Sequence, residues 1–254
     1  MGVVEAAREA AREQVLVAMM LGIPRLLGDP AWRAAEPDEG RGLGVLLAPG
    51  FGFGDRSLHL TATWLRKRGY VPIGARIGLN VGCTTELVDR LERRLAAHVE
   101  ATGGKVVLFG QSRGGGLCRL LAVRRPELVR GLVMLASPVL DQLGAHPSVV
   151  RVARKLARLS AAGIPGLLDQ DCFAGTCYET NSTAMARPLE VPAIAVFSRN
   201  DPIAPWELCA DPCADCVEVA SSHTGMSLDP EVYRLLAPRL AAWARISEPA
   251  PRAG

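Results

Sequence analysis

One serine stands at the centre of a glycine-flanked motif, Gly110-Gln111-Ser112-Arg113-Gly114. The apolar run Lys105–Phe109 before it is typical of a buried strand, and Gly114–Arg124 after it is typical of a helix. Glycines two residues before and after a serine permit the strained turn that lifts its hydroxyl clear of a sheet. A glycine-rich packing turn is the alternative, but the flanking strand and helix favour a nucleophile. We therefore predict that Ser112 attacks a carbonyl carbon, with Gly110 and Gly114 shaping the turn.

A serine hydroxyl needs a base to take its proton, and histidine is the usual one. The chain has four histidines. His59 and His98 fall inside predicted helices before the serine, and His146 lies in a segment that has no predicted strand. His223 alone follows a predicted strand after Ser112, on a loop at the carboxyl end of that strand. His223 is therefore the predicted base.

The acid of such a triad is expected between the serine and the histidine, after the preceding strand. The predicted strand Val191–Ser198 runs into a turn-rich loop that holds Asp201. The Asp201 carboxylate would accept the Nδ1–H of His223 and so orient the ring. An Asx turn before the next proline is the alternative role, and both roles can coexist. Asp211 and Asp215 are competing acids, but they lie further from the end of the strand.

Acyl transfer also needs hydrogen-bond donors for the negative charge that develops on the carbonyl oxygen. Two backbone groups are predicted to serve as this oxyanion hole. One is the N–H of Arg113, directly after the nucleophile, and the other is the N–H of Phe51, after the first predicted strand. Glycines on both sides of Phe51 allow the backbone to turn inward. The rings of Phe51 and Phe53 either form an apolar wall for the substrate or pack in the core.

The elements that must position these residues are apolar strands that alternate with amphipathic helices along the chain. The pattern predicts an α/β fold, with a mostly parallel sheet and helices on both faces. In such sheets, functional residues gather at the carboxyl ends of the strands. The predicted strands are Leu43–Ala48, Val71–Ile77, Lys105–Phe109, Gly131–Ala136, Val191–Ser198 and Cys216–Ala220. The predicted helices are Ser57–Arg68, Thr84–Thr102, Gly114–Arg124 and Asp229–Ala244.

Two segments stand outside this alternation. Residues 1–42 are expected to hold an amphipathic helix over Glu5–Leu21, ended by Gly22 and Pro24, and a polar connector. This helix is predicted to pack on the protein, and contact with a lipid interface is the alternative. Residues 138–190 lack a predicted strand, and an insertion of this length suggests a small helical cap over the catalytic face.

Length and composition are consistent with one domain of an α/β enzyme. The chain has 254 residues, 49% of them hydrophobic, and a formal net charge of +3 made of interspersed signs. A charge this small and dispersed argues against a nucleic-acid partner. No secretory signal or membrane-spanning run is recognised at the N-terminus, so a cytoplasmic location is expected. We expect a small-molecule substrate and no cofactor.

The seven cysteines leave at least one thiol unpaired, whatever their pairing. Cys172 and Cys177 bracket a glycine-containing turn, so a disulfide between them, or from Cys177 to Cys209, is one interpretation. Cys209, Cys213 and Cys216 have spacings that suggest a zinc clip, but no fourth ligand stands at a recognisable distance, so no metal is predicted. Two further cysteines are expected to be small buried hydrophobic residues: Cys83 and Cys118.

Taken together, these motifs resemble the actinobacterial esterase/lipase-like proteins of the α/β-hydrolase superfamily. The resemblance covers about residues 20 to 242 and implies an α/β-hydrolase fold. The motifs that carry it are Gly22-Ile-Pro-Arg-Leu-Leu, Pro49-Gly-Phe-Gly, Asn80-Val-Gly-Cys-Thr, Gly110-Gln-Ser-Arg-Gly-Gly, Cys172-Phe-Ala-Gly-Thr-Cys, Phe197-Ser-Arg-Asn-Asp201, Pro205-Trp-Glu-Leu-Cys and Ser222-His-Thr-Gly-Met.

The resemblance implies a carboxylic ester hydrolase with nucleophile Ser112, acid Asp201 and base His223, and no cofactor. One position departs from the superfamily pattern, since Pro49 stands where many members carry a histidine before the glycine. Two alternatives stay open. The same triad serves an acyltransferase or a thioesterase, and a hydrolase fold without catalysis serves as a binding module.

Overall fold

Six strands form one sheet in the computed structural model, which describes residues 21–34 and 36–246. Their order across the sheet is β2-β1-β3-β4-β5-β6, and every neighbouring pair is parallel. The strands are β1 (Gly44–Ala48), β2 (Val71–Gly74), β3 (Val106–Gln111), β4 (Val129–Leu135), β5 (Ala193–Phe197) and β6 (Asp215–Glu218). The predicted α/β fold with a parallel sheet is confirmed.

The inner strands are mainly apolar because both of their faces are covered. Every residue of β1, β3 and β5 is buried, whereas most residues of the edge strand β6 are exposed. Within the sheet, Leu108 of β3 pairs in register with Leu46 of β1 and with Leu132 of β4. A strand buried on both faces shows no alternation of polar and apolar residues. This explains why continuous aliphatic runs located the inner strands in the sequence.

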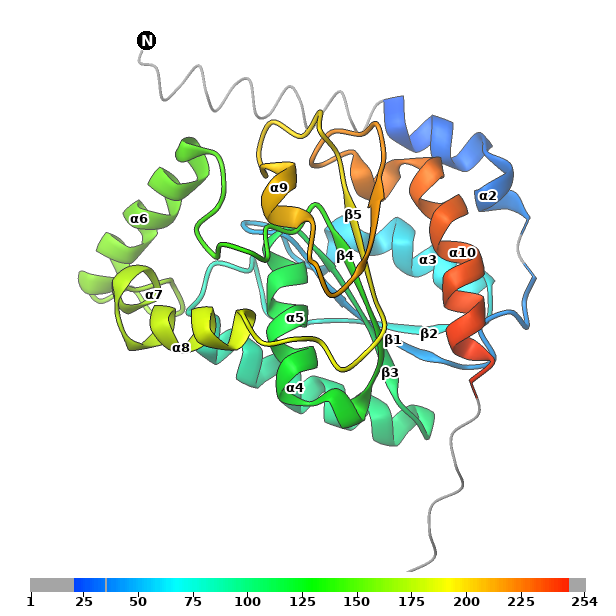
Figure 1. The fold of residues 1–254 in the computed structure, drawn as a ribbon, viewed down its shortest axis with the longest axis horizontal. Helices are drawn as coiled ribbons and strands as arrows, with labels where there is room; N and C mark the ends of the chain where they lie inside the picture. Colours follow the sequence, from blue (N-terminus) through cyan, green and yellow to red (C-terminus); the bar gives the residue numbers. More distant parts are fainter. Residues whose placement is uncertain (1–20, 35, 247–254) are drawn as a thin grey trace, which may run out of the picture.

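Helices cover both faces of the sheet (Figure 1). On one face, α4 and α5 pack their leucines against the alternate residues of β1, β3 and β4. On the other face, Trp64 of α3 and Tyr233 of α10 meet edge-on, with ring centroids 5.0 Å apart. The helices around the sheet are α2 (Pro30–Arg33), α3 (His59–Lys67), α4 (Thr84–Thr102), α5 (Arg113–Arg124), α9 (Trp206–Cys209) and α10 (Pro230–Ala244). Short 3-10 helices lie at Asp55–Leu58, Pro126–Leu128 and Met226–Leu228.

Residues 138–190, between β4 and β5, contain three helices and no strand. We call this stretch the cap segment, and Figure 1 shows its helices gathered beside α4 and α5, away from α10. Its helices are α6 (Pro147–Ala161), α7 (Asp171–Ala174) and α8 (Thr176–Met185). An apolar cluster joins α6 to α7 and α8, and it includes Ala157 and Phe173.

Two sequence predictions about where elements end are wrong. The strand predicted for Val71–Ile77 ends at Gly74, because the chain turns at Arg76, where φ is +55° and the backbone N–H donates to the Asp55 carboxylate. Gly22 and Pro24 do not end a helix, since residues 21–28 are helical. Here tertiary packing overrides local propensity. Leu26 is fully buried, and a Cβ at Gly22 would lie 3.1 Å from Leu228.

The helix predicted for Glu5–Leu21 lies almost wholly outside the described residues, so its packing and its contact with lipid stay predictions. Within residues 21–34 and 36–246, none of the helices combines the length and the apolar character that a membrane span requires.

Candidate active site

Ser112 occupies a sharp turn between the end of β3 and the start of α5. Its φ is +53° and its ψ is −127°, a backbone conformation that residues other than glycine rarely adopt. Close packing on both sides holds the turn. A Cβ at Gly110 would lie 2.4 Å from the Gly115 Cα, and a Cβ at Gly114 would lie 2.2 Å from the Ala48 carbonyl oxygen. Only glycine fits at these two positions, so α5 can start directly against the sheet.

The structure brings Ser112, His223 and Asp201 into one hydrogen-bonded chain. The Ser112 Oγ lies 2.9 Å from the His223 Nε2, and the His223 Nδ1 lies 2.7 Å from the Asp201 Oδ2. A carboxylate only accepts hydrogen bonds, so the proton between His223 and Asp201 belongs to Nδ1. The Nε2 atom is then free to accept the hydroxyl proton of Ser112.

Backbone groups hold the Asp201 carboxylate in this orientation. Its Oδ1 accepts hydrogen bonds from the backbone N–H groups of Ile203, at 2.7 Å, and Ala204, at 3.0 Å. The second carboxylate oxygen, Oδ2, accepts the hydrogen bond from the His223 Nδ1. The Asx turn that the sequence offered as an alternative role is therefore present, and it coexists with the contact to the histidine.

Two buried polar side chains that the sequence analysis missed position the loops of this site. The Gln111 side chain donates to the backbone carbonyl of His223 at 3.1 Å. The Ser198 Oγ accepts from the backbone N–H of Asn200, on the Asp201 loop, and of Ser221, on the His223 loop. Each follows or ends a central strand, which is the one signal that marks them in the sequence. They fix the distance between the acid and the base.

The competing acids are engaged elsewhere. Asp211 is fully buried and forms an ion pair with Arg119 of α5. Asp215 begins β6 and forms an ion pair with Arg239 of α10. Neither carboxylate contacts His223.

The other three histidines also have structural surroundings of their own. His59 begins α3, and the ring of His98, in α4, lies 2.8 Å from the Val71 carbonyl of the edge strand β2. His146 caps the start of α6 and accepts from the backbone N–H of Ser148. None of them contacts Ser112.

The predicted oxyanion-hole residues, Phe51 and Arg113, both line the pocket onto which Ser112 opens. The loop that carries Phe51 approaches the serine closely, because a Cβ at Gly50 would lie 3.4 Å from the Ser112 Cβ. Asn80, which is fully buried, connects the loop that carries Phe51 to the Arg113 side chain. Its Nδ2 donates to the Pro49 carbonyl at 2.6 Å, and its Oδ1 accepts from the Arg113 guanidinium at 3.2 Å.

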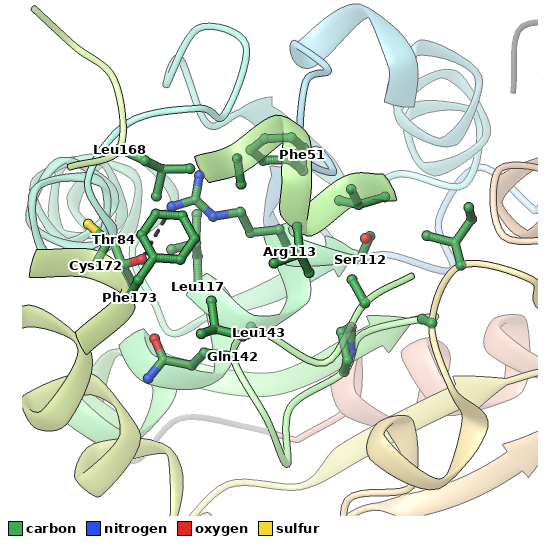
Figure 2. A pocket seen from close by; sticks show the side chains of 18 of the residues that line it. Phe51, Thr84, Ser112, Arg113, Leu117, Gln142, Leu143, Leu168, Cys172 and Phe173 are labelled. Carbon is green, nitrogen blue, oxygen red and sulfur yellow. Dashed lines mark hydrogen bonds between the residues drawn. The ribbon is translucent and has the colours of Figure 1, made fainter. Parts of the chain in front are cut away.

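The Arg113 side chain lies along the pocket wall and ends on the loop before α4 (Figure 2). Its guanidinium donates to the backbone carbonyls of Asn80 and Gly82, both at 2.8 Å, and to the Thr84 hydroxyl at 3.2 Å. Burial lowers the pKa of Arg113 to about 10, so the group is a cation at neutral pH. Within the described residues no carboxylate pairs with it.

The pocket itself is mainly apolar, and the cap segment forms much of its wall. In Figure 2, Leu168 and Phe173 lie on the opposite side of the pocket from Ser112, and Leu117 and Leu143 lie near Phe173. The other apolar lining residues are Leu120, Pro138, Ala145, Val149, Val150, Ala153, Met185, Ile203 and Ala204.

All seven cysteines are free thiols, so the interpretation of a disulfide from Cys177 to Cys172 or to Cys209 is wrong. The Sγ atoms of Cys172 and Cys177 lie 3.7 Å apart, and Cys209 packs in a separate cluster with Phe197 and Ala204. The burial expected for Cys83 and Cys118 is confirmed. Hydrogen bonds from Cys172 and Cys83 lower the pKa of the Cys177 thiol, and the hydrogen bond with Cys177 raises the pKa of Cys172.

The sequence matches a protein-family model described as "alpha/beta hydrolase fold" over residues 48–182, more than half of the chain. The chain therefore belongs to the alpha/beta hydrolase family. Among curated proteins, none matches it in sequence.

Solved structures of hydrolases share the fold at low sequence identity. A lipase of Bacillus licheniformis, BlEst2, has a TM-score of 0.60 at 12% identity, over 81% of this chain and 94% of that one. The alpha/beta hydrolase enzyme MGS-MChE2, from a sediment metagenome of the Mar Chica lagoon in Morocco, has a TM-score of 0.56 at 21% identity, over 78% and 90%. A monoacylglycerol lipase of Paleococcus ferrophilus has a TM-score of 0.55 at 17% identity, over 82% and 96%. At these identities the likeness concerns the fold.

Proposed function

We propose that this hydrolase cleaves carboxylic esters through an acyl-enzyme intermediate, with Ser112 as nucleophile, His223 as base and Asp201 as the supporting acid. The observation that carries the proposal is the chain of two hydrogen bonds, 2.9 Å from serine to histidine and 2.7 Å from histidine to aspartate. This is the geometry of a serine activated by a neighbouring base that a carboxylate orients.

In the first half-reaction, the His223 Nε2 takes the hydroxyl proton as the Ser112 Oγ attacks the ester carbonyl carbon. Asp201 stabilises the imidazolium that forms. The negative charge on the carbonyl oxygen is stabilised by the N–H groups of Phe51 and Arg113. His223 then gives its proton to the leaving alcohol, and the acyl group stays bonded to Ser112.

In the second half-reaction, His223 takes a proton from water, and the resulting hydroxide attacks the acyl carbon. The tetrahedral intermediate collapses, the bond to the Ser112 Oγ breaks, and the proton returns to that oxygen from His223. The products are a carboxylic acid and the free enzyme. The chain's own residues supply every group that these steps require.

The apolar lining of the pocket supports an uncharged acyl chain as the bound group, since burying a charge there carries a large desolvation penalty. The lipases among the structures that share the fold are consistent with such a substrate. We also propose that the chain belongs to the actinobacterial esterase/lipase-like branch of the family, on the motifs it shares with that branch.

Labelling with a fluorophosphonate tests the proposed function without knowledge of the substrate. The reagent should form a stoichiometric adduct on Ser112, because only an activated serine attacks phosphorus at a useful rate. Intact-protein and peptide mass spectrometry measure the stoichiometry and the site. Absence of an adduct, or an adduct on another serine with Ser112 unmodified, would overturn the proposal.

Substitution of Gly116 by leucine should shorten the acyl chain that the pocket accepts. Gly116 lies in α5 and lines the pocket, and a Cβ there would have one neighbour within 4 Å, the Met185 Cε at 3.7 Å. The leucine side chain therefore extends into the pocket without a clash at its Cβ. We expect kcat/KM to fall about tenfold or more for long-chain p-nitrophenyl esters. The acetyl ester serves as the internal control, and an equal fall for all chain lengths would contradict the prediction.

A further inference from the structure

Three thiols from two distant parts of the chain meet beside the pocket. The Sγ atoms of Cys83, Cys172 and Cys177 all lie within 4.8 Å of one another, and all three residues are buried. The Cys177 Sγ lies 3.6 Å from that of Cys83 and 3.7 Å from that of Cys172. We call these residues the thiol cluster. The proposed ester hydrolysis does not use them.

The thiol cluster lies where the cap segment meets the rest of the fold. Cys83 directly precedes α4, whereas Cys172 belongs to α7 and Cys177 to α8. Cys172 also lines the pocket of Ser112, and Figure 2 shows it beside Thr84 and Phe173. Any ligand shared by the three sulfurs would therefore join the cap segment to the loop before α4.

The surroundings of the thiol cluster favour negative charge on one of its sulfurs, that of Cys177. The Cys177 Sγ lies 3.3 Å from the Thr85 hydroxyl, and it accepts a hydrogen bond from the Asn181 amide at 3.5 Å. The Arg113 guanidinium donates to Gly82 and Thr84, the residues on either side of Cys83. No carboxylate of the described residues pairs with Arg113, and ionised thiols of the cluster would stabilise its positive charge.

We propose that Cys83, Cys172 and Cys177 form a binding site for one Zn²⁺ ion. Zinc binds thiolate sulfur at about 2.3 Å in tetrahedral geometry, which places two ligand sulfurs about 3.8 Å apart. The two shortest sulfur separations in the cluster are close to this value. Three thiolates exceed the charge of Zn²⁺ by one, and Arg113 supplies one positive charge. Water completes the coordination, as in other zinc sites with three protein ligands.

A shared ion explains the arrangement better than a disulfide does. A disulfide joins two sulfurs at about 2.05 Å and leaves the third without a role. Here Cys177 lies almost equally far from its two neighbours, so neither pair is favoured. Bound zinc would hold α7 and α8 on the loop before α4, and this loop is braced by Arg113, the residue after the serine.

The full-length protein, reduced and stripped of metal with a chelator, allows a direct test. Titration with Co²⁺, a spectroscopic substitute for Zn²⁺, should give one equivalent of binding and a sulfur-to-cobalt charge-transfer band. X-ray absorption of the zinc-loaded protein should show three sulfur ligands at about 2.3 Å. Zinc should also raise Tm, because it binds the folded state. Failure to bind, fewer than three sulfur ligands, or binding of Cu⁺ but not of Zn²⁺ would overturn the proposal.

Two variants, each with one cysteine replaced by serine, test where the zinc ion binds. The Cys177→Ser variant should lower zinc affinity on the order of 100-fold or more, because it removes a ligand. The Cys213→Ser variant, which changes an exposed cysteine outside the cluster, should bind as the wild type does. The opposite pattern would place the metal elsewhere and overturn the proposal. If Cys177→Ser fails to fold, the spectroscopy of the wild-type protein decides the matter.

Discussion

Replacing Ser112 by alanine is expected to lower kcat for an aryl ester by a factor on the order of 10⁶, with KM changed by less than about threefold. The variant lacks the hydroxyl oxygen that lies 2.9 Å from the His223 Nε2. The apolar pocket that binds the acyl chain is left intact. Alanine and serine tolerate the positive φ at this turn to a similar extent, so the fold should persist. Initial rates with a p-nitrophenyl ester at high enzyme concentration measure the loss.

The Ser57→Ala variant is the matched control for this experiment. Ser57 is exposed and lies in the 3-10 helix before α3, and its hydroxyl donates to the Gly54 carbonyl. Its removal should leave kcat unchanged. Retention by Ser112→Ala of more than about 1% of wild-type turnover would show that another group attacks the ester, since the residual effect of binding and the oxyanion hole is far smaller than that.

The sequence was most informative where function depends on chain order and on the ends of strands. Ser112 follows a central strand, and Asp201 and His223 were selected as the acid and the base that follow two later strands. Because parallel strands end at the same edge of the sheet, three residues far apart in the chain were expected to meet. The structure places them within hydrogen-bond distance of one another. Their catalytic roles stay predictions.

Chain order and the ends of strands do not predict which side chains from distant segments come into contact. Asn80 is 31 positions from Pro49, and Cys83 is 94 positions from Cys177, yet each pair is in contact. Spacing along the chain suggests a disulfide from Cys177 to Cys172 or to Cys209, and it gives no sign that Cys83 completes the cluster. Cys83 lies close to Cys177 because the cap segment packs against the loop before α4.

The predicted oxyanion-hole residues show how far sequence position alone can go. Sequence position identified the N–H groups of Phe51 and Arg113 as candidates, and both residues line the pocket. The side chain of Asn80 links the loop after β1 to Arg113 at the start of α5. The backbone of Asn80 has a positive φ of 50°, a conformation that asparagine tolerates better than most residues do. Neither its burial nor its two partners follow from a local pattern, because both depend on the approach of separate loops.

The Asp201→Asn variant is expected to lower kcat by a factor on the order of 10⁴. The asparagine oxygen can still accept from the backbone N–H groups of Ile203 and Ala204, so the loop keeps its shape. The amide NH₂ then faces the His223 Nδ1, where the carboxylate oxygen had been an acceptor at 2.7 Å. A donor in this position favours the tautomer with its proton on Nε2, and that tautomer cannot accept the proton of Ser112.

The Asp229→Asn variant makes the same change of charge at a site that only caps a helix. Asp229 accepts from the Glu231 backbone N–H at the start of α10, and asparagine caps helices about as well as aspartate does. Its kcat should equal that of the wild type. A fall of less than about tenfold in Asp201→Asn, measured beside this control at matched stability, would mean that the carboxylate does not set the histidine tautomer. Asp201 would then be the residue of an Asx turn and nothing more.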